Sequence, residues 1–169
     1  MLKITNNLTP FFEDCYRRIS VREYAKIMNI SPPTASKVLK NYLKEGLFKK
    51  EEQYDRIFFS ANRSNSLFKD LSRMYWKEQL KDIITKIETE SISPTIILFG
   101  SLSKAENKND SDIDIAIIGV NKKIDISKEE KKLKREIQLF DYINFKAIKN
   151  KELANNIING YILKGKVKL

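Results

Sequence analysis

Two segments decide how the second half of the chain folds: Leu98-Phe99-Gly100-Ser101 and, after ten intervening residues, Asp112-Ile113-Asp114-Ile115-Ala116-Ile117-Ile118. Each part belongs to a short apolar run of the kind that forms a buried strand. Side chains two positions apart on a strand point to the same face, so we expect Asp112 and Asp114 side by side and the isoleucines on the opposite face. Two carboxylates this close repel each other, and sharing Mg²⁺, which prefers oxygen ligands and substrate phosphates, relieves the repulsion. The stretch therefore predicts a metal-phosphate site.

Gly100 and Ser101 are expected on the other side of the same cleft. A glycine directly after a buried strand lets the backbone approach a phosphate closely, and the residues that follow can begin a helix whose N–H groups bind an anion. Ser101 adds a hydroxyl donor, and Lys104 adds a positive charge that can neutralise a leaving pyrophosphate. We therefore take Gly100, Ser101 and Lys104 as candidate nucleotide-binding residues, and Asp112 and Asp114 as candidate catalytic residues and metal ligands.

Gly100-Ser101 followed at this spacing by Asp112-x-Asp114 resembles the signature of the DNA polymerase β-like nucleotidyltransferase superfamily, especially its minimal prokaryotic members. The resemblance covers about residues 95–169. It implies transfer of a nucleotidyl group from a nucleoside triphosphate, with ATP as the expected donor, to a hydroxyl group, with Mg²⁺ as cofactor. The minimal members include antitoxin-like proteins that modify a partner protein, so a toxin or another acceptor protein is one partner class that the resemblance implies.

The sequence departs from this signature at the third acidic position. Active members usually carry a further carboxylate on a later strand, where it ligates the catalytic metal and helps to activate the attacking hydroxyl. We expect the matching strand at 143–148, with Asn144 where the acid would stand; Asp141 would replace it if the strand began earlier or bulged. An amide can coordinate a metal but cannot accept a proton. Ala105 also departs, since many relatives have glycine after the basic residue.

The first 62 residues predict a winged helix-turn-helix. Apolar residues at helical spacing predict a helix over 8–18, and Ser20 begins a capping box for a helix over 21–28. Ser31 caps the next helix, which starts with two prolines and stops at a glycine. Two short apolar runs around a polar stretch then predict a two-stranded wing.

The helix over 32–45 is the expected reader of DNA. Polar residues near its N-terminus are expected to reach base edges and its lysines to contact phosphates, the alternative being an ordinary solvated face or a protein-docking module. The candidate DNA-binding residues are Thr34, Ser36, Lys37, Lys40, Asn41 and Lys44. We expect double-stranded DNA as the partner and a homodimer as the reader of two half-sites.

Composition excludes several kinds of chemistry. The 169 residues include 32 Lys and Arg against 22 Asp and Glu, a net charge of +10 that suits an anionic partner, although a biased genome composition would produce the same excess. The chain has no histidine and a single cysteine, Cys15, which excludes an imidazole base, a His-ligated metal and an intramolecular disulfide. No apolar run reaches the roughly 20 residues that span a bilayer, so we expect a soluble cytoplasmic protein without membrane association.

These observations predict three parts: a winged helix-turn-helix DNA-binding domain over 1–62, a connecting helix over 63–92 and a nucleotidyltransferase-like α/β domain over 93–169, with helices at 128–139 and 151–159. The apolar positions of the connecting segment, over 64–90, fit one long amphipathic helix or a broken pair. The fold class is α+β in the first part and α/β in the last. The favoured function is a DNA-binding protein with a Mg²⁺-dependent nucleotidyltransferase domain that acts on an unknown hydroxyl. The alternative is a non-catalytic winged-helix transcription regulator whose degenerate nucleotidyltransferase domain binds nucleotide or mediates assembly.

Overall fold

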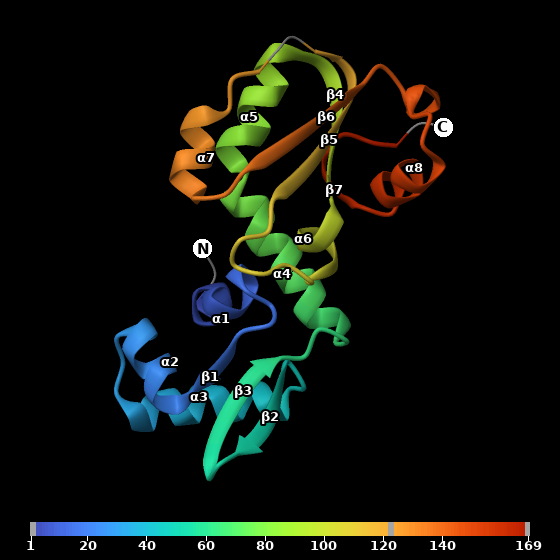
Figure 1. Cartoon of the computed structure of the whole chain (residues 1–169). Helices are drawn as coiled ribbons and strands as arrows, with labels where there is room; N and C mark the ends of the chain where they lie inside the picture. Colours follow the sequence, from blue (N-terminus) through green and yellow to red (C-terminus); the bar gives the residue numbers. More distant parts are fainter. Residues whose placement is uncertain (1–2, 122–123, 168–169) are drawn as a thin grey trace. The chain divides into compact units, whose positions relative to one another are not determined.

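The structure, a computed structural model, describes residues 3–121 and 124–167 (Figure 1). The chain divides into two compact units. The N-terminal unit comprises Met1–Tyr75 and Ala105–Asn109, and the C-terminal unit comprises Trp76–Lys104 and Asp110–Leu169. The division therefore falls inside a helix, α4 (Ser66–Gln79), and assigns a short later segment to the N-terminal unit. Within the described residues, every helix is too short or too polar to cross a membrane.

The N-terminal unit combines helices with a three-stranded antiparallel sheet. In this sheet β3 (Arg56–Ala61) lies between β1 (Arg18–Ser20) and β2 (Phe48–Gln53). The predicted helix over 8–18 is wrong in its second half, because the chain turns at Asp14, whose side chain accepts a hydrogen bond from the Tyr16 N–H at 2.9 Å. The next residues form a strand that pairs with β3. Before α4 the elements are α1 (Lys3–Glu13), β1 (Arg18–Ser20), α2 (Val21–Met28), α3 (Pro32–Lys44), β2 (Phe48–Gln53) and β3 (Arg56–Ala61).

The helices α2 and α3 begin where the sequence predicts. Ser20 Oγ accepts from the Glu23 N–H at 3.3 Å, and Glu23 Oε2 accepts from the Ser20 N–H at 2.8 Å, which confirms the capping box. Hydrogen bonds from the Ser20 backbone and hydroxyl hold the pKa of Glu23 below its ordinary value. Ser31 caps α3 by accepting from the Thr34 N–H, and Asn29, in the left-handed conformation, ends α2.

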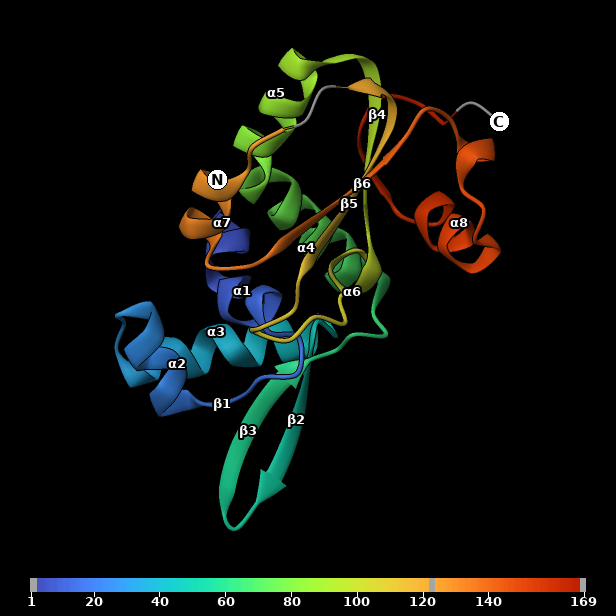
Figure 2. The same cartoon turned by 45° about the horizontal axis from the view of Figure 1, so that its top comes forward.

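The strands β2 and β3 form a hairpin closed by Tyr54 and Asp55 (Figure 2). Both turn residues have positive φ, 50° and 56°, as a type I′ turn requires, and this turn matches the twist of the two strands. The inner face of the hairpin carries Phe48 into the core, where its ring lies 4.3 Å from that of Phe11. The outer face is mostly polar but also carries Phe58, with the Arg18 guanidinium 5.1 Å from the centroid of its ring.

The C-terminal unit is built on a four-stranded sheet in the order β6-β5-β4-β7, which supports the expected α/β class. The strand β4 (Ser91–Phe99) pairs antiparallel with β5 (Ile113–Asn121) and with β7 (Tyr161–Lys164), and β5 pairs parallel with β6 (Ile137–Tyr142). The helices are α5 (Lys81–Glu90), α6 (Gly100–Lys104), α7 (Ser127–Leu133) and α8 (Lys151–Ile158), and Phe145–Ala147 forms a 3₁₀ turn.

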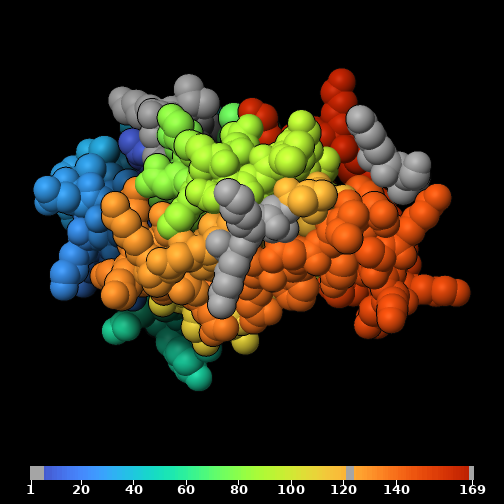
Figure 3. All heavy atoms as spheres, turned by 90° about the horizontal axis from the view of Figure 1, so that it is seen from above, coloured from blue at the N-terminus to red at the C-terminus, as the bar shows by residue number. Residues whose placement is uncertain are grey.

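One face of the sheet is covered by α5, which packs on β4 through buried isoleucines. The helix α7 lies beside α5 (Figure 3), and ion pairs join Lys86 to Glu129 at 3.4 Å and Lys132 to Asp82 at 2.6 Å. Of the two forms expected for the connecting segment, one long helix or a broken pair, the structure has the broken pair, α4 and α5. These pairs are exposed or partly exposed and contribute little stability compared with the buried isoleucines.

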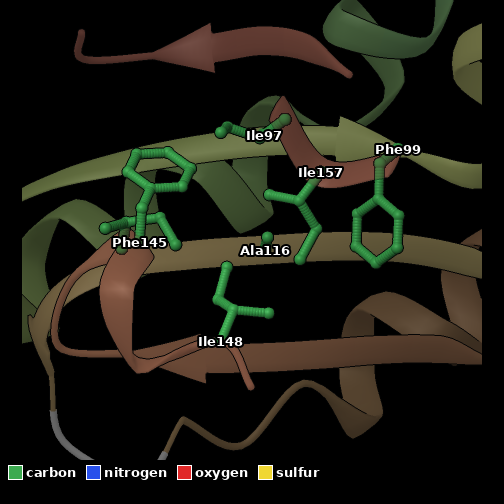
Figure 4. Close-up of a cluster of buried hydrophobic side chains, with 7 residues drawn as sticks. Ile97, Phe99, Ala116, Phe145, Ile148 and Ile157 are labelled. Carbon is green, nitrogen blue, oxygen red and sulfur yellow. The ribbon is translucent and has the colours of Figure 1, made fainter. Parts of the chain in front are cut away.

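The other face of the sheet carries a buried cluster under α8 and the 3₁₀ turn (Figure 4). Its members are Ile97, Phe99, Ala116, Ile118, Phe145, Ile148 and Ile157. At one end of this cluster the rings of Phe99 and Phe140 meet edge to face, with centroids 5.1 Å apart. The aromatic pair therefore ends the apolar core on this face, and the polar site described below begins beyond it.

Two predicted elements of the C-terminal unit are wrong. The helix expected over 128–139 ends at Leu133, because Lys134 takes the left-handed conformation, and the following residues form β6. The strand expected over 143–148 is a 3₁₀ turn, and Ile143, which would belong on an inner strand, is 72% exposed. Pairing with β5 decides both outcomes, because it aligns Ile113 with Ile137 and so selects 137–142 as the strand.

Candidate active site

Asp112 lies directly before β5, and Asp114 is the second residue of that strand, on the face that continues from the buried aromatic pair. Asp114 is the register partner of Phe99 on β4 and of Gln138 on β6. Ile113, Ile115 and Ile117 are fully buried on the opposite face. The sheet thus presents carboxylates on one face because the alternation of the strand commits the other face to the core.

Burial raises the pKa of the Asp114 carboxyl above its usual value, and the nearby charge of Asp112 raises it further. Asp112 Oδ2 accepts a hydrogen bond from Gln138 Nε2 at 2.9 Å. Asp112 and Asp114 are both partly buried, and the charge of Asp112 disfavours the charged form of Asp114, so a cation would stabilise the site.

The backbone of Gly100 lies directly against the Asp114 carboxylate. Gly100 has φ +69°, and a Cβ atom at this position would overlap Asp114 Oδ2. Ser101 follows as a partly exposed residue of α6, and Ser103 donates from its buried hydroxyl to the Gly100 carbonyl at 2.9 Å. Glycine is required here for two reasons, its left-handed conformation and the absence of a side chain. The turn after β4 and the carboxylate of β5 are thereby brought together.

Lys104 lies at the end of α6 and is exposed. Its Nζ donates to Asn156 Oδ1 of α8 at 3.3 Å. In this arrangement Lys104 joins α6 to α8, and a long flexible side chain can leave such an exposed bond at small cost. Its expected role toward a phosphate stays a prediction.

Gln138, and not Asn144, faces the carboxylate pair from the neighbouring strand. Asn144 is exposed and its Oδ1 accepts from the Ala147 N–H at 3.1 Å, so it caps the 3₁₀ turn. Asp141 lies three positions after Gln138 on β6, an odd number that turns it to the opposite face. The expected placement of Asn144 beside the carboxylate pair is therefore wrong, and Gln138 stands there instead.

Sequence reasoning missed Gln138 because the charged segment before it was interpreted as one helix through residue 139. The available signal was the alternation in Ile137-Gln138-Leu139-Phe140, which matches the period of a strand. Among the residues that the structure describes, three or more acidic, cysteine or histidine side chains do not gather anywhere in a metal-binding group. One divalent cation would fit the carboxylates of Asp112 and Asp114 and the amide of Gln138, with phosphate and water as further ligands. This group lacks the third carboxylate of a two-metal site.

The candidate DNA-binding residues lie along α3. Its buried stripe consists of Ala35, Leu39 and Tyr42, which pack into the core of the N-terminal unit. The Thr34 hydroxyl lies 2.8 Å from Ser31 Oγ and so takes part in the helix cap. Of the candidates, Ser36 is half-buried, and the exposed ones are Thr34, Lys37, Lys40, Asn41 and Lys44.

A mixed sheet that presents a carboxylate pair beside a glycine-serine turn defines a nucleotidyltransferase-type site. The family described as "Polymerase beta, Nucleotidyltransferase" matches residues 78–167, from the end of α4 to beyond β7. The chain belongs to this family. No curated protein and no solved structure matches the chain.

We predict that Asp114→Asn stabilises the metal-free protein at neutral pH. Because the folded state raises the pKa of Asp114, it binds this proton more tightly than the unfolded state does, and stability falls as pH rises through the raised pKa. An amide removes that loss, so Tm should rise by a few degrees at pH 7, and the gain should shrink toward about pH 4, where an ordinary Asp becomes protonated. Thermal unfolding in EDTA measures both. Asp110→Asn, at an exposed carboxyl in the loop before β5, is the control. An equal gain in Tm from Asp110→Asn would contradict the prediction.

Proposed function

We propose that the C-terminal unit binds a nucleoside triphosphate with Mg²⁺ and transfers its nucleotidyl group to a hydroxyl acceptor. The observation that carries the proposal is the pair Asp112 and Asp114, of which Asp114 packs against Gly100, in a chain that belongs to a nucleotidyltransferase family. Asp112 and Asp114 would hold the cation, and Ser101 and the backbone at Gly100 would bind the triphosphate. When bound, Mg²⁺ supplies positive charge that offsets the carboxylates and the phosphates.

In this reaction the acceptor oxygen forms a bond to the α-phosphorus, the bond from that phosphorus to the bridging oxygen breaks, and pyrophosphate leaves. The acceptor proton needs a base. Gln138 cannot accept it, since an amide has no available basic site, so the proton passes to solvent or to a phosphate oxygen. We therefore expect slow transfer compared with a site that has a third carboxylate.

Incubation with α-labelled nucleoside triphosphates, Mg²⁺ and candidate acceptors tests the proposal. We expect label transfer by the unaltered chain and a loss of at least about 100-fold in Asp112→Ala or Asp114→Ala, since each removes a direct ligand. Asp110→Ala, at an exposed carboxyl just before the pair, should retain activity. Equal transfer by all four proteins would contradict the assignment of the site.

Gln138 favours a second candidate, nucleotide binding without transfer. The Asp112 carboxylate already accepts from its amide, and a site with one cation and no base can hold a triphosphate as a regulatory ligand. Calorimetric titration with ATP and Mg²⁺ separates the candidates. Saturable binding that needs both aspartates, with no label on any acceptor, supports the second; binding followed by label transfer supports the first.

We propose further that the N-terminal unit is a winged helix-turn-helix that binds double-stranded DNA. The support is local: α2 and α3 are joined by a three-residue turn, α3 exposes lysines, and a β-hairpin follows. The hairpin tip is mixed in charge, with Lys50 paired to Glu52 at 3.9 Å, so the main phosphate contacts are expected from α3.

Replacing Lys37, Lys40 and Lys44 together by Ala is expected to weaken DNA binding and to flatten its salt dependence. If Lys40 and Lys44 each contact a phosphate, the slope of log affinity against log salt should fall in magnitude by about 2. Fluorescence anisotropy with labelled duplexes at several salt concentrations measures this slope. Lys77, Lys128 and Lys149, all exposed outside α3, supply a control of equal charge. An unchanged slope in the α3 variant would remove α3 as the reader.

A further inference from the structure

The N-terminal unit contains a cavity of about 570 Å³ whose lining residues all lie outside α3. We call it the sheet-face cavity. Its floor is a row of register partners across the three strands, in which Arg18 of β1 and Lys49 of β2 flank Ser60 of β3. This row lies on the outer face of the sheet, since its neighbours Ile19 and Phe59 are buried on the inner face. The volume is in the range of small-molecule sites.

The lining of the sheet-face cavity carries excess positive charge. It includes the cations Arg18, Lys49, Arg63 and Lys69 and the acids Glu51 and Glu106. Glu51 is already paired with Arg18 at 3.0 Å. Over the part of the chain that the structure describes, the ion pairs include none of the other three cations. Three cations therefore face one remaining carboxylate, that of Glu106.

Arg63 is oriented by an aromatic ring. Its guanidinium lies over the Tyr16 ring, 3.8 Å from the centroid. Stacking engages the flat face of the guanidinium and leaves its in-plane N–H groups able to bind an oxyanion. The hydroxyls of Ser60 and Ser64 add donors to the same lining. A guanidinium, two ammonium groups and two hydroxyls match the several oxygens of a phosphate better than the two of a carboxylate.

We propose that the sheet-face cavity binds a phosphate group, either of a nucleic-acid backbone or of a free nucleotide or pyrophosphate. The inference goes beyond the proposed function, because its residues belong neither to α3 nor to the carboxylate site. The positive lining, the oriented Arg63 and the cavity volume carry it.

Titration of inorganic pyrophosphate into the full-length protein without Mg²⁺, at constant ionic strength, tests the proposal by amide NMR. We expect saturable shifts at Ser60, Arg63, Ser64 and Lys69. The triple variant Lys49→Gln, Arg63→Gln and Lys69→Gln should bind pyrophosphate at least about tenfold more weakly. Each substitution removes a charged donor, and a hydrogen bond from a charged donor to phosphate is stronger than one from a neutral donor. Lys77→Gln, Lys128→Gln and Lys149→Gln, at exposed lysines outside both the cavity and α3, is the control of equal charge. No saturable shift, or equal affinity in both variants, would overturn the proposal.

Two further arms identify the source of the phosphate. Weaker binding of duplex DNA by the cavity variant assigns the site to the nucleic-acid backbone, whereas unchanged DNA affinity with weaker binding of Mg²⁺-free ATP assigns it to a free nucleotide. Should the triple variant fold poorly, Lys49→Gln with Lys69→Gln leaves the stacked Arg63 in place and should still reduce affinity. Loss of DNA binding only in the α3 variant, with pyrophosphate binding intact, separates this site from the proposed reader helix.

Discussion

Gln138→Glu is expected to raise the rate of nucleotidyl transfer by about 100-fold or more, the range that a positioned general base supplies. The substitution keeps the length of the side chain and replaces its amide by a carboxylate. Gln138 lies beside Asp114 in register and donates to Asp112, so the new carboxylate would complete a group of three. It could then accept the acceptor proton and share a second cation.

The same substitution should lower stability in the absence of divalent cations. A third negative charge beside Asp112 and Asp114 adds repulsion to a site where burial and a like charge already raise the pKa of Asp114. Added Mg²⁺ should restore the lost Tm, because binding to the folded state offsets the repulsion. Thermal unfolding with and without Mg²⁺ measures this effect independently of any acceptor.

Asn144→Asp is the matched control for Gln138→Glu. It adds one carboxylate to the same unit, at a side chain whose oxygen can still cap the 3₁₀ turn. We expect neither faster transfer nor a new dependence of Tm on Mg²⁺. If Asn144→Asp produced both effects and Gln138→Glu neither, the assignment of the third acidic position to β6 would be wrong.

Asn107→Ala is expected to destabilise the N-terminal unit by about 3 kcal/mol, because it removes three hydrogen bonds of a buried side chain. The Asn107 side chain is 0% exposed. Its Nδ2 donates to the carbonyls of Phe12 at 2.9 Å and Glu13 at 3.0 Å, and its Oδ1 accepts from Cys15 Sγ at 3.2 Å.

Hydrogen exchange of the N-terminal unit's amides measures this loss, since it reports the free energy of opening for each unit separately. Asn109→Ala, at an exposed position in the same segment, should change stability by less than about 0.5 kcal/mol. Equal stability of the Asn107 and Asn109 variants would contradict the prediction.

Local signals in the sequence determined the parts of the molecule that depend on neighbouring residues. The capping box of Ser20 and Glu23 set the start of α2, and alternation placed Asp114 opposite the buried isoleucines of β5. The turn at Gly100 follows from the end of an apolar run. Each of these features needs only a few consecutive residues, whose backbone geometry repeats wherever the pattern occurs.

Only the tertiary structure decided which distant residues meet. The strands β1 and β7 are too short to be recognised alone, and each exists because a longer strand offers its backbone groups for pairing. Parallel pairing with β5 brought Gln138 to the carboxylates, and Asn107, polar and in a loop, is buried because it binds carbonyls 95 and 94 positions away. The sequence by itself determined the carboxylate pair and its glycine turn; the third neighbour of that pair was decided by strand pairing, since hydrogen bonds between strands join residues whose separation along the chain no local pattern encodes.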